Sequence, residues 1–439
     1  MGKIRKNIAK IISKYLGRSV FVYLTNILTI YRKKKENHII RKYLRTSDIL
    51  VEQISKKERI KAIFFVISLS MWKYHDLFSL LKADERFNPV IVPFVVPASS
   101  LTLAKEMRDQ IVEYCVKNSF NYSEYFDYEK GRYVNCQNLT SADVVVYSQP
   151  YNRSYPELRI ENYLKRSLFI YTPYGLQVDD SPQFYDNLLQ NIAQRIFLSC
   201  NLELKCQQHA SRNQGINARV VGLNIYEDIK KAKNSPWKND QRKKIIWAPH
   251  HSIRKIDPLN NSNFLDICFD MLTLAKEMSK QFQFAFKPHP SLKGKLFEIW
   301  GKEKTESYYG EWKNLENTFI SDGLYADLFK FSDALIHDCS SFTCEYLVTD
   351  KPVLYLSKGN HISGLNDFGV ACYNQHYKGS SIKDIRLFLE NQVLAGKDYL
   401  KENRDNFVDK ELKPFNNNGV GMNMYNLINE LFSTQKKLR

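Results

Sequence analysis

Residues 333–347 read Asp-Ala-Leu-Ile-His-Asp-Cys-Ser-Ser-Phe-Thr-Cys-Glu-Tyr-Leu, and this stretch carries the clearest signal for the fold. An apolar run that closes on Leu335 and Ile336 predicts a short strand, and Ser340 and Ser341 then open an amphipathic helix. The first N–H groups of a helix lack partners, and the helix dipole places its positive end beside them. A strand followed directly by a helix with hydroxyl residues at its start therefore predicts an anion-binding site.

A second apolar run, about fifty residues earlier, ends in a similar way: Phe284-Ala285-Phe286 is followed by Lys287-Pro288-His289-Pro290. Lys287 is a point charge suited to a phosphate, and the flanking prolines restrict His289 to extended backbone geometry. A histidine fixed at a strand end can donate to a phosphate oxygen or act as a general acid for a leaving phosphate. We therefore expect Lys287, His289 and the Ser340–Ser341 turn to hold one phosphate group.

Apolar runs alternate with helical segments along most of the chain, which predicts an α/β fold with parallel sheets. The polar segment 226–243 is the best linker candidate, because it separates two α/β series of comparable length. We expect a basic amphipathic segment over 1–58, one domain over 59–225 and another over 244–430. In such sheets ligands bind outside the carboxyl ends of the strands, where the polar residues described above lie.

Four more side chains follow predicted strand ends and are candidates for chemistry. Asp338 is either a catalytic base or an acceptor of hydrogen bonds from a nearby loop. Glu345, in the second turn of its helix, either reaches a ribose hydroxyl or lies on a solvated face. His250 and His251 follow another strand end. Because adjacent side chains of an extended chain point to opposite sides, we expect at most one of these two histidines to enter the cleft.

Several phosphate-binding and metal-binding patterns are missing from the sequence. It has no G-x-x-x-x-G-K-[ST], G-x-G-x-x-G or G-x-S-x-G motif and no acid-rich metal cluster. The eight cysteines form no Cys-x-x-Cys pair, which favours reduced thiols, and Cys339 is interpreted as a small buried spacer rather than a reactive thiolate. We expect a transfer reaction without metal or cofactor, in which basic side chains and a helix N-terminus stabilise the charge.

The positive charge is concentrated near the start of the chain. The formal net charge is +17, and residues 1–45 hold thirteen Lys or Arg against one acid, Glu36. Apolar and basic residues recur there at helical spacing, which is typical of a helix on an anionic membrane surface; the alternative is a solvated helix packed on the body. The apolar stretch 19–30 is too short to span a bilayer. Nucleic-acid binders spread their charge over a binding face, so no nucleic-acid partner is expected.

Taken together, the motifs resemble those of the CDP-glycerol glycerophosphotransferase family of teichoic-acid and capsule polymer synthesis. Lys287-Pro288-His289-Pro290 is similar to the family's Arg/Lys-Pro-His-Pro element, and Asp338-Cys339-Ser340-Ser341 to its Asp-x-Ser-Ser element. Lys351-Pro352-Val353-Leu354-Tyr355 is similar to its Lys-Pro-hydrophobic strand, so the resemblance covers about 244–356. It implies a GT-B architecture, in which two Rossmann-like domains face a cleft and the protein sits on the cytosolic face of a membrane. The first domain would then bind the acceptor and the second the donor nucleotide.

The resemblance also implies roles for individual residues. His289 and Ser340–Ser341 would act on the pyrophosphate of a CDP-linked donor. Glycerol phosphate, or a related polyol phosphate, would pass to a lipid-linked or polymer acceptor while CMP leaves. The family carries a His-Gly pair in its first domain, where this chain reads Tyr174-Gly175. A buried Tyr is a poor base at neutral pH, so either Asp179, Asp180 or His250 deprotonates the acceptor, or the reaction differs.

Two other functions stay open from the sequence. Bacterial sialyltransferases have a His-Pro and a Ser-Ser motif for CMP-sugars on the same architecture. A glycosyltransferase that uses a CMP-sugar or another nucleotide-sugar for capsule or O-antigen synthesis is therefore the enzymatic alternative. The alternative of another class is a non-catalytic basic protein that binds a membrane or a polyanion. The placement of charge separates these classes, because the excess of Lys and Arg is confined to the first 45 residues.

Overall fold

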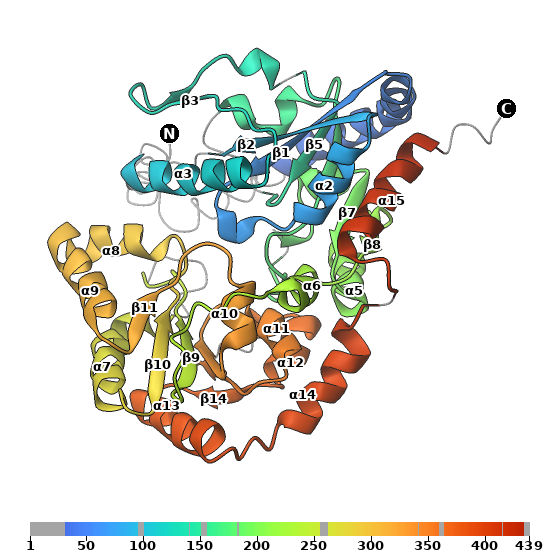
Figure 1. Ribbon diagram of the computed structural model, residues 1–439. Coiled ribbons are helices and arrows are strands. Elements are labelled where there is room, and N and C mark those ends of the chain that lie inside the picture. The colour runs from blue at the N-terminus through green and yellow to red at the C-terminus, as the bar shows by residue number, and fades with distance from the viewer. Residues whose placement is uncertain are drawn as a thin grey trace, which may run out of the picture.

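The computed structural model describes residues 31–94, 101–139, 141–150, 156–181, 184–254, 262–340, 342–359, 364–414 and 416–433. Two α/β domains lie one above the other in Figure 1, and each contains a six-stranded parallel sheet. The prediction of two Rossmann-like parallel-sheet domains with a helical N-terminal segment is therefore confirmed. A short antiparallel pair, β3 (Phe126–Asp127) and β4 (Arg132–Tyr133), lies outside these sheets.

The N-terminal sheet has the strand order β2-β1-β5-β6-β7-β8, with every neighbouring pair parallel. All four residues of β5 and of β6 are buried, as expected for central strands covered on both faces. The strands are β1 (Ile60–Val66), β2 (Phe87–Pro93), β5 (Val144–Tyr147), β6 (Leu168–Tyr171), β7 (Arg195–Leu198) and β8 (Ala218–Val220). The helices are α2 (His75–Ala83), α3 (Leu101–Lys117), α4 (Leu188–Ile192), α5 (Asn201–Ala210) and α6 (Asn224–Lys231), with a 3-10 turn η1 (Leu69–Met71).

The C-terminal sheet has the order β11-β10-β9-β12-β13-β14 and is also parallel throughout. Its strands are β9 (Lys243–Ala248), β10 (Phe282–Phe286), β11 (Thr318–Ile320), β12 (Ala334–His337), β13 (Val353–Leu356) and β14 (Tyr377–Gly379). Its helices are α7 (Phe264–Glu277), α8 (Leu292–Trp300), α9 (Lys302–Asn314), α10 (Ala326–Phe331), α11 (Phe342–Glu345), α12 (Asp367–Tyr373), α13 (Ile382–Phe388) and α14 (Lys401–Phe407). Because β9, β10 and β12 are adjacent, the loops that follow them open at the same edge of the sheet.

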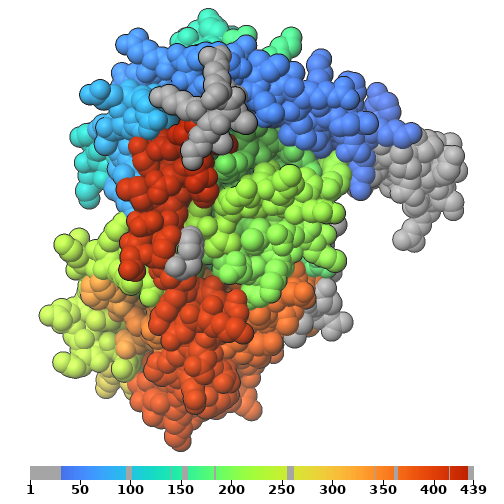
Figure 2. All heavy atoms as spheres, turned by 90° about the vertical axis from the view of Figure 1, so that its right-hand side faces the viewer, coloured from blue at the N-terminus to red at the C-terminus, as the bar shows by residue number. Residues whose placement is uncertain are grey.

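The last helix, α15 (Val420–Ser433), leaves the C-terminal domain and packs on the N-terminal one. Val420, Met424 and Ile428 are buried in the N-terminal core. Figures 1 and 2 show this red segment running along the side of the molecule from the lower domain to the upper. The predicted 244–430 unit thus ends in a helix that belongs, by its packing, to the other domain. The predicted linker 226–243 likewise begins inside α6 rather than in irregular chain.

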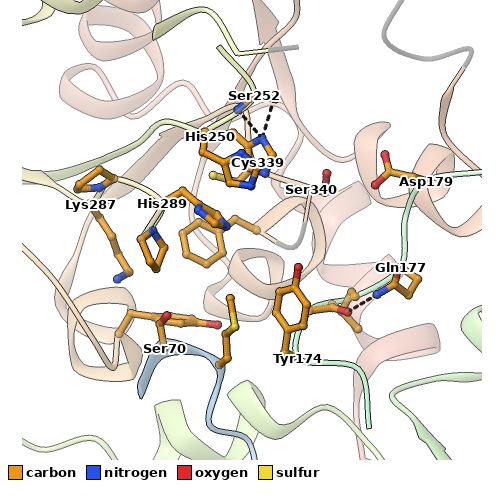
Figure 3. Close-up of a pocket in the computed structure, with 18 of the residues that line it drawn as sticks. Ser70, Tyr174, Gln177, Asp179, His250, Ser252, Lys287, His289, Cys339 and Ser340 are labelled. Atoms are coloured by element: carbon orange, nitrogen blue, oxygen red, sulfur yellow. Dashed lines mark hydrogen bonds between the residues drawn. The ribbon is translucent and has the colours of Figure 1, made fainter. Parts of the chain in front are cut away.

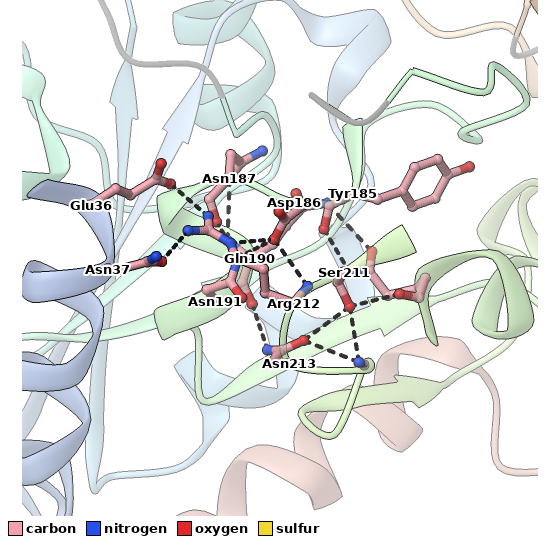
Figure 4. Close-up of polar contacts among 12 residues, drawn as sticks. Glu36, Asn37, Tyr185, Asp186, Asn187, Gln190, Asn191, Ser211, Arg212 and Asn213 are labelled. Atoms are coloured by element: carbon pink, nitrogen blue, oxygen red, sulfur yellow. Dashed lines mark hydrogen bonds and ion pairs between the residues drawn. The ribbon is translucent and has the colours of Figure 1, made fainter. Parts of the chain in front are cut away.

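The N-terminal helix, which spans residues 31–55, is docked on the N-terminal domain. Tyr43 is buried in that domain's core, and its hydroxyl donates to the Ser167 carbonyl at 3.0 Å. Figure 4 shows Arg212 between Glu36 and Asn37 of the helix on one side and Asp186 on the other. The described part of the basic segment is therefore a helix packed on the body, whereas the predicted amphipathic turns before residue 31 lie outside the described residues. No helix in the described part of the chain is both long and apolar enough to cross a membrane.

Candidate active site

A cavity of about 410 Å³ lies between the two domains. Its walls come from the chain segments that follow β1 and β6 in one domain and β9, β10 and β12 in the other. The carboxyl ends of both parallel sheets thus face it, which is where α/β sheets place their ligands. The polar residues of its lining include Ser70, Tyr174, Gln177, Asp179, His250, His251, Ser252, Lys287, His289 and Ser340 (Figure 3).

Lys287 lines this cavity, and its side chain carries a buried ammonium group. Its Nζ donates to the Gly323 carbonyl at 3.3 Å and lies 5.1 Å from the centre of the Tyr325 ring. Burial disfavours the charged form and lowers the pKa of Lys287 to about 8, while Asp322 acts in the opposite direction. A bound anion would favour the charged form again, so the site is suited electrostatically to a phosphate.

His289 is fixed in one orientation beside Lys287. Its backbone N–H donates to the Pro249 carbonyl at 3.1 Å, and its Nδ1 accepts the Ser291 N–H at 3.1 Å. An accepting Nδ1 leaves the proton of the neutral ring on Nε2. Burial, followed by the nearby His251 and His250, holds the pKa of His289 well below its usual range. His289 is therefore a neutral hydrogen-bond donor at neutral pH.

Both His250 and His251 line the cavity, so the prediction that at most one enters is wrong. Their rings stack 4.2 Å apart, and they lie 5.1 Å and 4.1 Å from the His289 ring, respectively. The reason is that the chain has already left β9 at Ala248, so the alternation of an extended strand no longer applies.

These three histidines are the one group of three or more candidate metal ligands among the described residues, with ligand atoms within 4.8 Å of one another. Their surroundings are cationic, because Lys295 Nζ lies 3.1 Å from His251 Nδ1 and Lys287 faces the same cavity. No carboxylate belongs to the group. Such surroundings favour an anion over a divalent cation.

Asp338 acts as an anchor and does not line the cavity. Its Oδ1 accepts the His250 N–H at 2.5 Å, and its Oδ2 accepts the Asn263 N–H at 2.9 Å. Burial raises the pKa of Asp338 to about 6, although these N–H groups favour the charged form. Of the two roles considered from the sequence, the geometry matches the acceptor of loop hydrogen bonds. Asp338 thus positions the segment that carries His250.

Asp179, not Asp180, faces the cavity. Asp179 is 7% exposed and lies opposite Ser340 (Figure 3), whereas Asp180 is exposed and uses its N–H to bind the Gly364 carbonyl at 2.9 Å. Burial raises the pKa of Asp179 to about 6, while the Ser340 hydroxyl favours the charged form. The expected catalytic role of Asp180 is therefore not supported by its position, because neighbouring residues of this extended segment point to opposite sides.

The remaining predicted residues divide between the cavity and its surroundings. Tyr174 and Gly175 line it, and the Tyr174 hydroxyl points inward in Figure 3. Ser340 lines it as well, whereas Ser341 lies outside the described residues. Glu345 does not line this cavity and is not solvated: it is 3% exposed and accepts the Tyr325 hydroxyl at 2.5 Å.

Cys339 lines the cavity as a protonated thiol. Its Sγ donates to the Ala248 carbonyl at 3.0 Å, and burial raises the pKa of Cys339 well above its usual range. The thiolate is the reactive form of cysteine, so these surroundings match a small buried spacer rather than a nucleophile.

Two features of the site had no sequence signal. Lys73, from the N-terminal domain, donates to the Tyr325 hydroxyl at 2.5 Å and lies 3.4 Å from the Glu345 carboxylate in the other domain. Asn366 holds the segment that carries Asp179, because its Nδ2 donates to the Gln177 carbonyl at 2.8 Å and its N–H to the Val178 carbonyl at 3.0 Å. Both contacts join segments far apart in sequence, so no local pattern reveals them.

The fold is a two-domain α/β architecture of the GT-B type, with this cavity between the domains. Residues 225–361 match the family model described as CDP-Glycerol:Poly(glycerophosphate) glycerophosphotransferase. The C-terminal domain thus matches the glycerophosphotransferase family over these residues, and the resemblance stated from Lys287–Pro290 and Asp338–Ser341 is confirmed. None of the curated proteins compared with the chain matches it.

Solved structures agree on the fold. The wall teichoic acid polymerase TagF superposes with a TM-score of 0.56 at 12% identity, covering 92% of this chain and 99% of that chain. A TagF variant soaked with CDPG superposes with a TM-score of 0.55 at 13% identity, and the coverage of both chains is the same. MnaA of S. aureus, solved with UDP, superposes with a TM-score of 0.52 at 13% identity, covering 87% of this chain and 97% of that chain. At these identities the likeness shows the shared two-domain architecture.

Proposed function

We propose that the protein transfers glycerol phosphate, or a related polyol phosphate, from a CDP-linked donor to a cell-surface polymer or a lipid-linked acceptor and releases CMP. The family match of residues 225–361 supports this donor class. The observation that carries the proposal is that Lys287, His289 and Ser340, from two strand ends of one domain, line a single cavity opposite Asp179 of the other. That arrangement offers phosphate-binding groups on one wall and a candidate base on the facing wall.

In this proposal the donor diphosphate lies against Lys287, His289 and Ser340. The buried ammonium of Lys287 stabilises the negative charge that grows on the CMP phosphate as it leaves. The Nε2–H of His289 donates to an oxygen of the same phosphate, because its Nδ1 is already engaged by Ser291. Ser340 lines the same cavity and adds a hydroxyl donor.

The acceptor is activated by Asp179, which takes the place of the family histidine that Tyr174 replaces. The Asp179 carboxylate removes the proton of an acceptor hydroxyl, and the resulting oxygen attacks the phosphorus of the polyol phosphate. The bond between that phosphorus and the bridging oxygen breaks, and CMP leaves with the electron pair. A carboxylate whose pKa is raised to about 6 by burial is a stronger base than an exposed one and is still ionised at neutral pH.

The test is an assay of CMP release from CDP-glycerol, CDP-ribitol and a CMP-sugar in parallel, with and without EDTA. We expect CMP from a CDP-polyol and unchanged rates in EDTA, because side chains rather than a metal stabilise the charge in this proposal. Release from the CMP-sugar alone would replace the proposal with the glycosyltransferase alternative. Loss of activity in EDTA, restored by added metal, would contradict the metal-free mechanism and direct attention to His250, His251 and His289.

We also propose that residues 1–45 attach the protein to the cytoplasmic face of the cell membrane. The concentration of positive charge in this segment supports the proposal. The matched test removes residues 1–30 and keeps the docked helix with its Glu36 and Tyr43 contacts. We expect the truncated protein to lose sedimentation with vesicles that contain phosphatidylglycerol, while the full chain sediments with them and not with neutral vesicles. Equal sedimentation of both proteins would contradict the proposal.

A further inference from the structure

A second interdomain pocket, of about 260 Å³, lies next to the active-site cavity. It is lined by the start of α2, by α6 and by the segment that enters α10. The two pockets share Ser70 and Tyr325 in their lining, so they are neighbouring parts of one cleft. Lys73 lines the second pocket, and its contact with the Tyr325 hydroxyl at 2.5 Å lies at the boundary between the two. A chain-like substrate in this pocket could therefore extend one end into the active site.

The second pocket has aromatic walls. Trp72, Tyr114 and Tyr325 line it, and the Trp72 Nε1–H donates to the Tyr114 hydroxyl at 3.1 Å. The same hydroxyl lies 2.6 Å from His75 Nδ1. The positions of these rings are thus fixed by hydrogen bonds at their polar ends. Apolar and aromatic walls with a few placed polar groups are the usual lining of a small-molecule site.

The charges of this pocket differ from those of the active-site cavity. Its two lysines are already paired, because Lys73 contacts Glu345 at 3.4 Å and Lys231 forms an ion pair with Asp76. The Asp228 carboxylate lines the pocket and has no hydrogen bond or ion pair within the part of the chain that the structure describes. Burial raises the pKa of Asp228 to about 6. Lys73 and Lys231 act in the opposite direction and favour the charged form. The partly buried Asp228 carboxylate is therefore a hydrogen-bond acceptor that a ligand in this pocket can reach.

We propose that this pocket, named here the Asp228 pocket, binds a neutral, hydroxyl-rich part of the acceptor, a sugar or a polyol. The inference rests on the proposed function and adds the chemistry of the acceptor to it. Hydroxyl groups donate to the Asp228 carboxylate, and a carbon face of the ligand packs on the partly exposed ring of Tyr114. A phosphate is opposed here, because the carboxylates of Asp228 and Asp327 remain after Lys231 is paired with Asp76 and Lys73 with Glu345. The donor's phosphates and the acceptor's hydroxyls are thus sorted into neighbouring pockets by charge.

The test measures saturation-transfer NMR on the full-length protein saturated with CDP. The neutral probes are glycerol, ribitol and methyl β-D-glucopyranoside, and the anionic probes are inorganic phosphate and glycerol 3-phosphate. We expect at least one neutral probe to bind, and its affinity to fall about tenfold in Asp228→Ala, the loss typical of a hydrogen bond to a charged group. Asp228→Asn, which keeps the side-chain volume, is a second variant, and Glu85→Gln on the exposed surface is the matched control. Which neutral probe binds best distinguishes a polyol from a sugar.

Calorimetric titration of CDP into each variant separates this inference from the proposed function. Absence of CDP binding in the wild-type protein would contradict the proposed function. Normal CDP binding with no neutral probe bound, or with neutral-probe binding unchanged in both Asp228 variants, would overturn the Asp228 pocket alone. Binding of inorganic phosphate that is strengthened in Asp228→Ala, with no binding of neutral probes, would also overturn it.

Discussion

Replacing His289 with alanine is expected to lower the rate of CMP release about 10²- to 10³-fold, the loss typical of removing one hydrogen-bond donor to a developing negative charge. The variant loses the Nε2–H donor that faces the departing phosphate, together with the ring that Ser291 orients. Substrate saturation is expected to remain measurable, because Lys287 and Ser340 still line the cavity. The measurement is the initial rate of CMP release from the preferred CDP-polyol.

Two further variants make this result specific. His209→Ala removes an exposed histidine on α5 and is expected to leave the rate unchanged. His289→Gln keeps an N–H group in the place of Nε2–H, so it is expected to recover part of the lost rate if His289 stabilises the leaving phosphate by hydrogen bonding. Recovery would be absent if a proton is transferred from the ring. A rate for His289→Ala within about threefold of the wild-type rate would exclude His289 from the reaction.

Replacing Asp179 with asparagine is expected to lower kcat about 10²- to 10³-fold while the affinity for CDP is retained, because the base is lost and the phosphate-binding wall stays intact. Only the deprotonated carboxylate acts as the base, and burial raises the pKa of Asp179 to about 6. The wild-type rate should therefore stop rising near pH 7 and fall about tenfold per pH unit well below pH 6. This low-pH limb should be absent from the residual rate of Asp179→Asn.

The neighbouring carboxylate provides the control for that experiment. Asp180 is exposed and binds the Gly364 carbonyl through its backbone, so Asp180→Asn should keep nearly the full rate and the wild-type pH profile. If Asp180→Asn lost as much activity as Asp179→Asn, the assignment would have to be reversed. An unchanged low-pH limb in Asp179→Asn would point to another titrating group.

Much of the fold was predictable because the strands of parallel sheets are continuous apolar runs. The runs ending at Phe286 and Ile336 were predicted to be strands of a parallel sheet, and they form β10 and β12, which lie on either side of β9. Since parallel strands end at one edge of their sheet, the meeting of Lys287, His289 and Ser340 at one cavity followed from topology alone.

Other parts depend on contacts that carry no local pattern. The choice between Asp179 and Asp180 depends on the register of an interdomain bridge, in which Asp179 pairs with Leu365. The burial of Glu345 depends on Lys73 and Tyr325, which belong to segments distant in sequence. An amphipathic pattern over α15 indicates an apolar face but not which domain covers it, and the buried Val420 and Met424 show that the first domain does.

The two pockets differ in charge, and this difference bears on how an acceptor reaches the active site. The active-site cavity is lined by Lys287 and by His251, which Lys295 contacts, whereas the Asp228 pocket presents a carboxylate. The contacts of Lys73 with Tyr325 and Glu345 join the domains at the boundary between the pockets. An acceptor that occupies the Asp228 pocket would therefore place its terminal hydroxyl near Asp179 only after passing Ser70 and Tyr325, which both pockets share.

The central claim is that Lys287, with His289 and Ser340, holds the diphosphate of a CDP-linked donor, and calorimetric titration of CDP tests it most directly. We predict that the wild-type protein binds CDP and that Lys287→Met weakens the affinity about 10- to 100-fold, the cost of removing a buried charged donor to a phosphate. Lys302→Met, which removes an exposed lysine at the start of α9, should leave the affinity unchanged. Equal affinity for CDP in Lys287→Met and in the wild-type protein would contradict the claim.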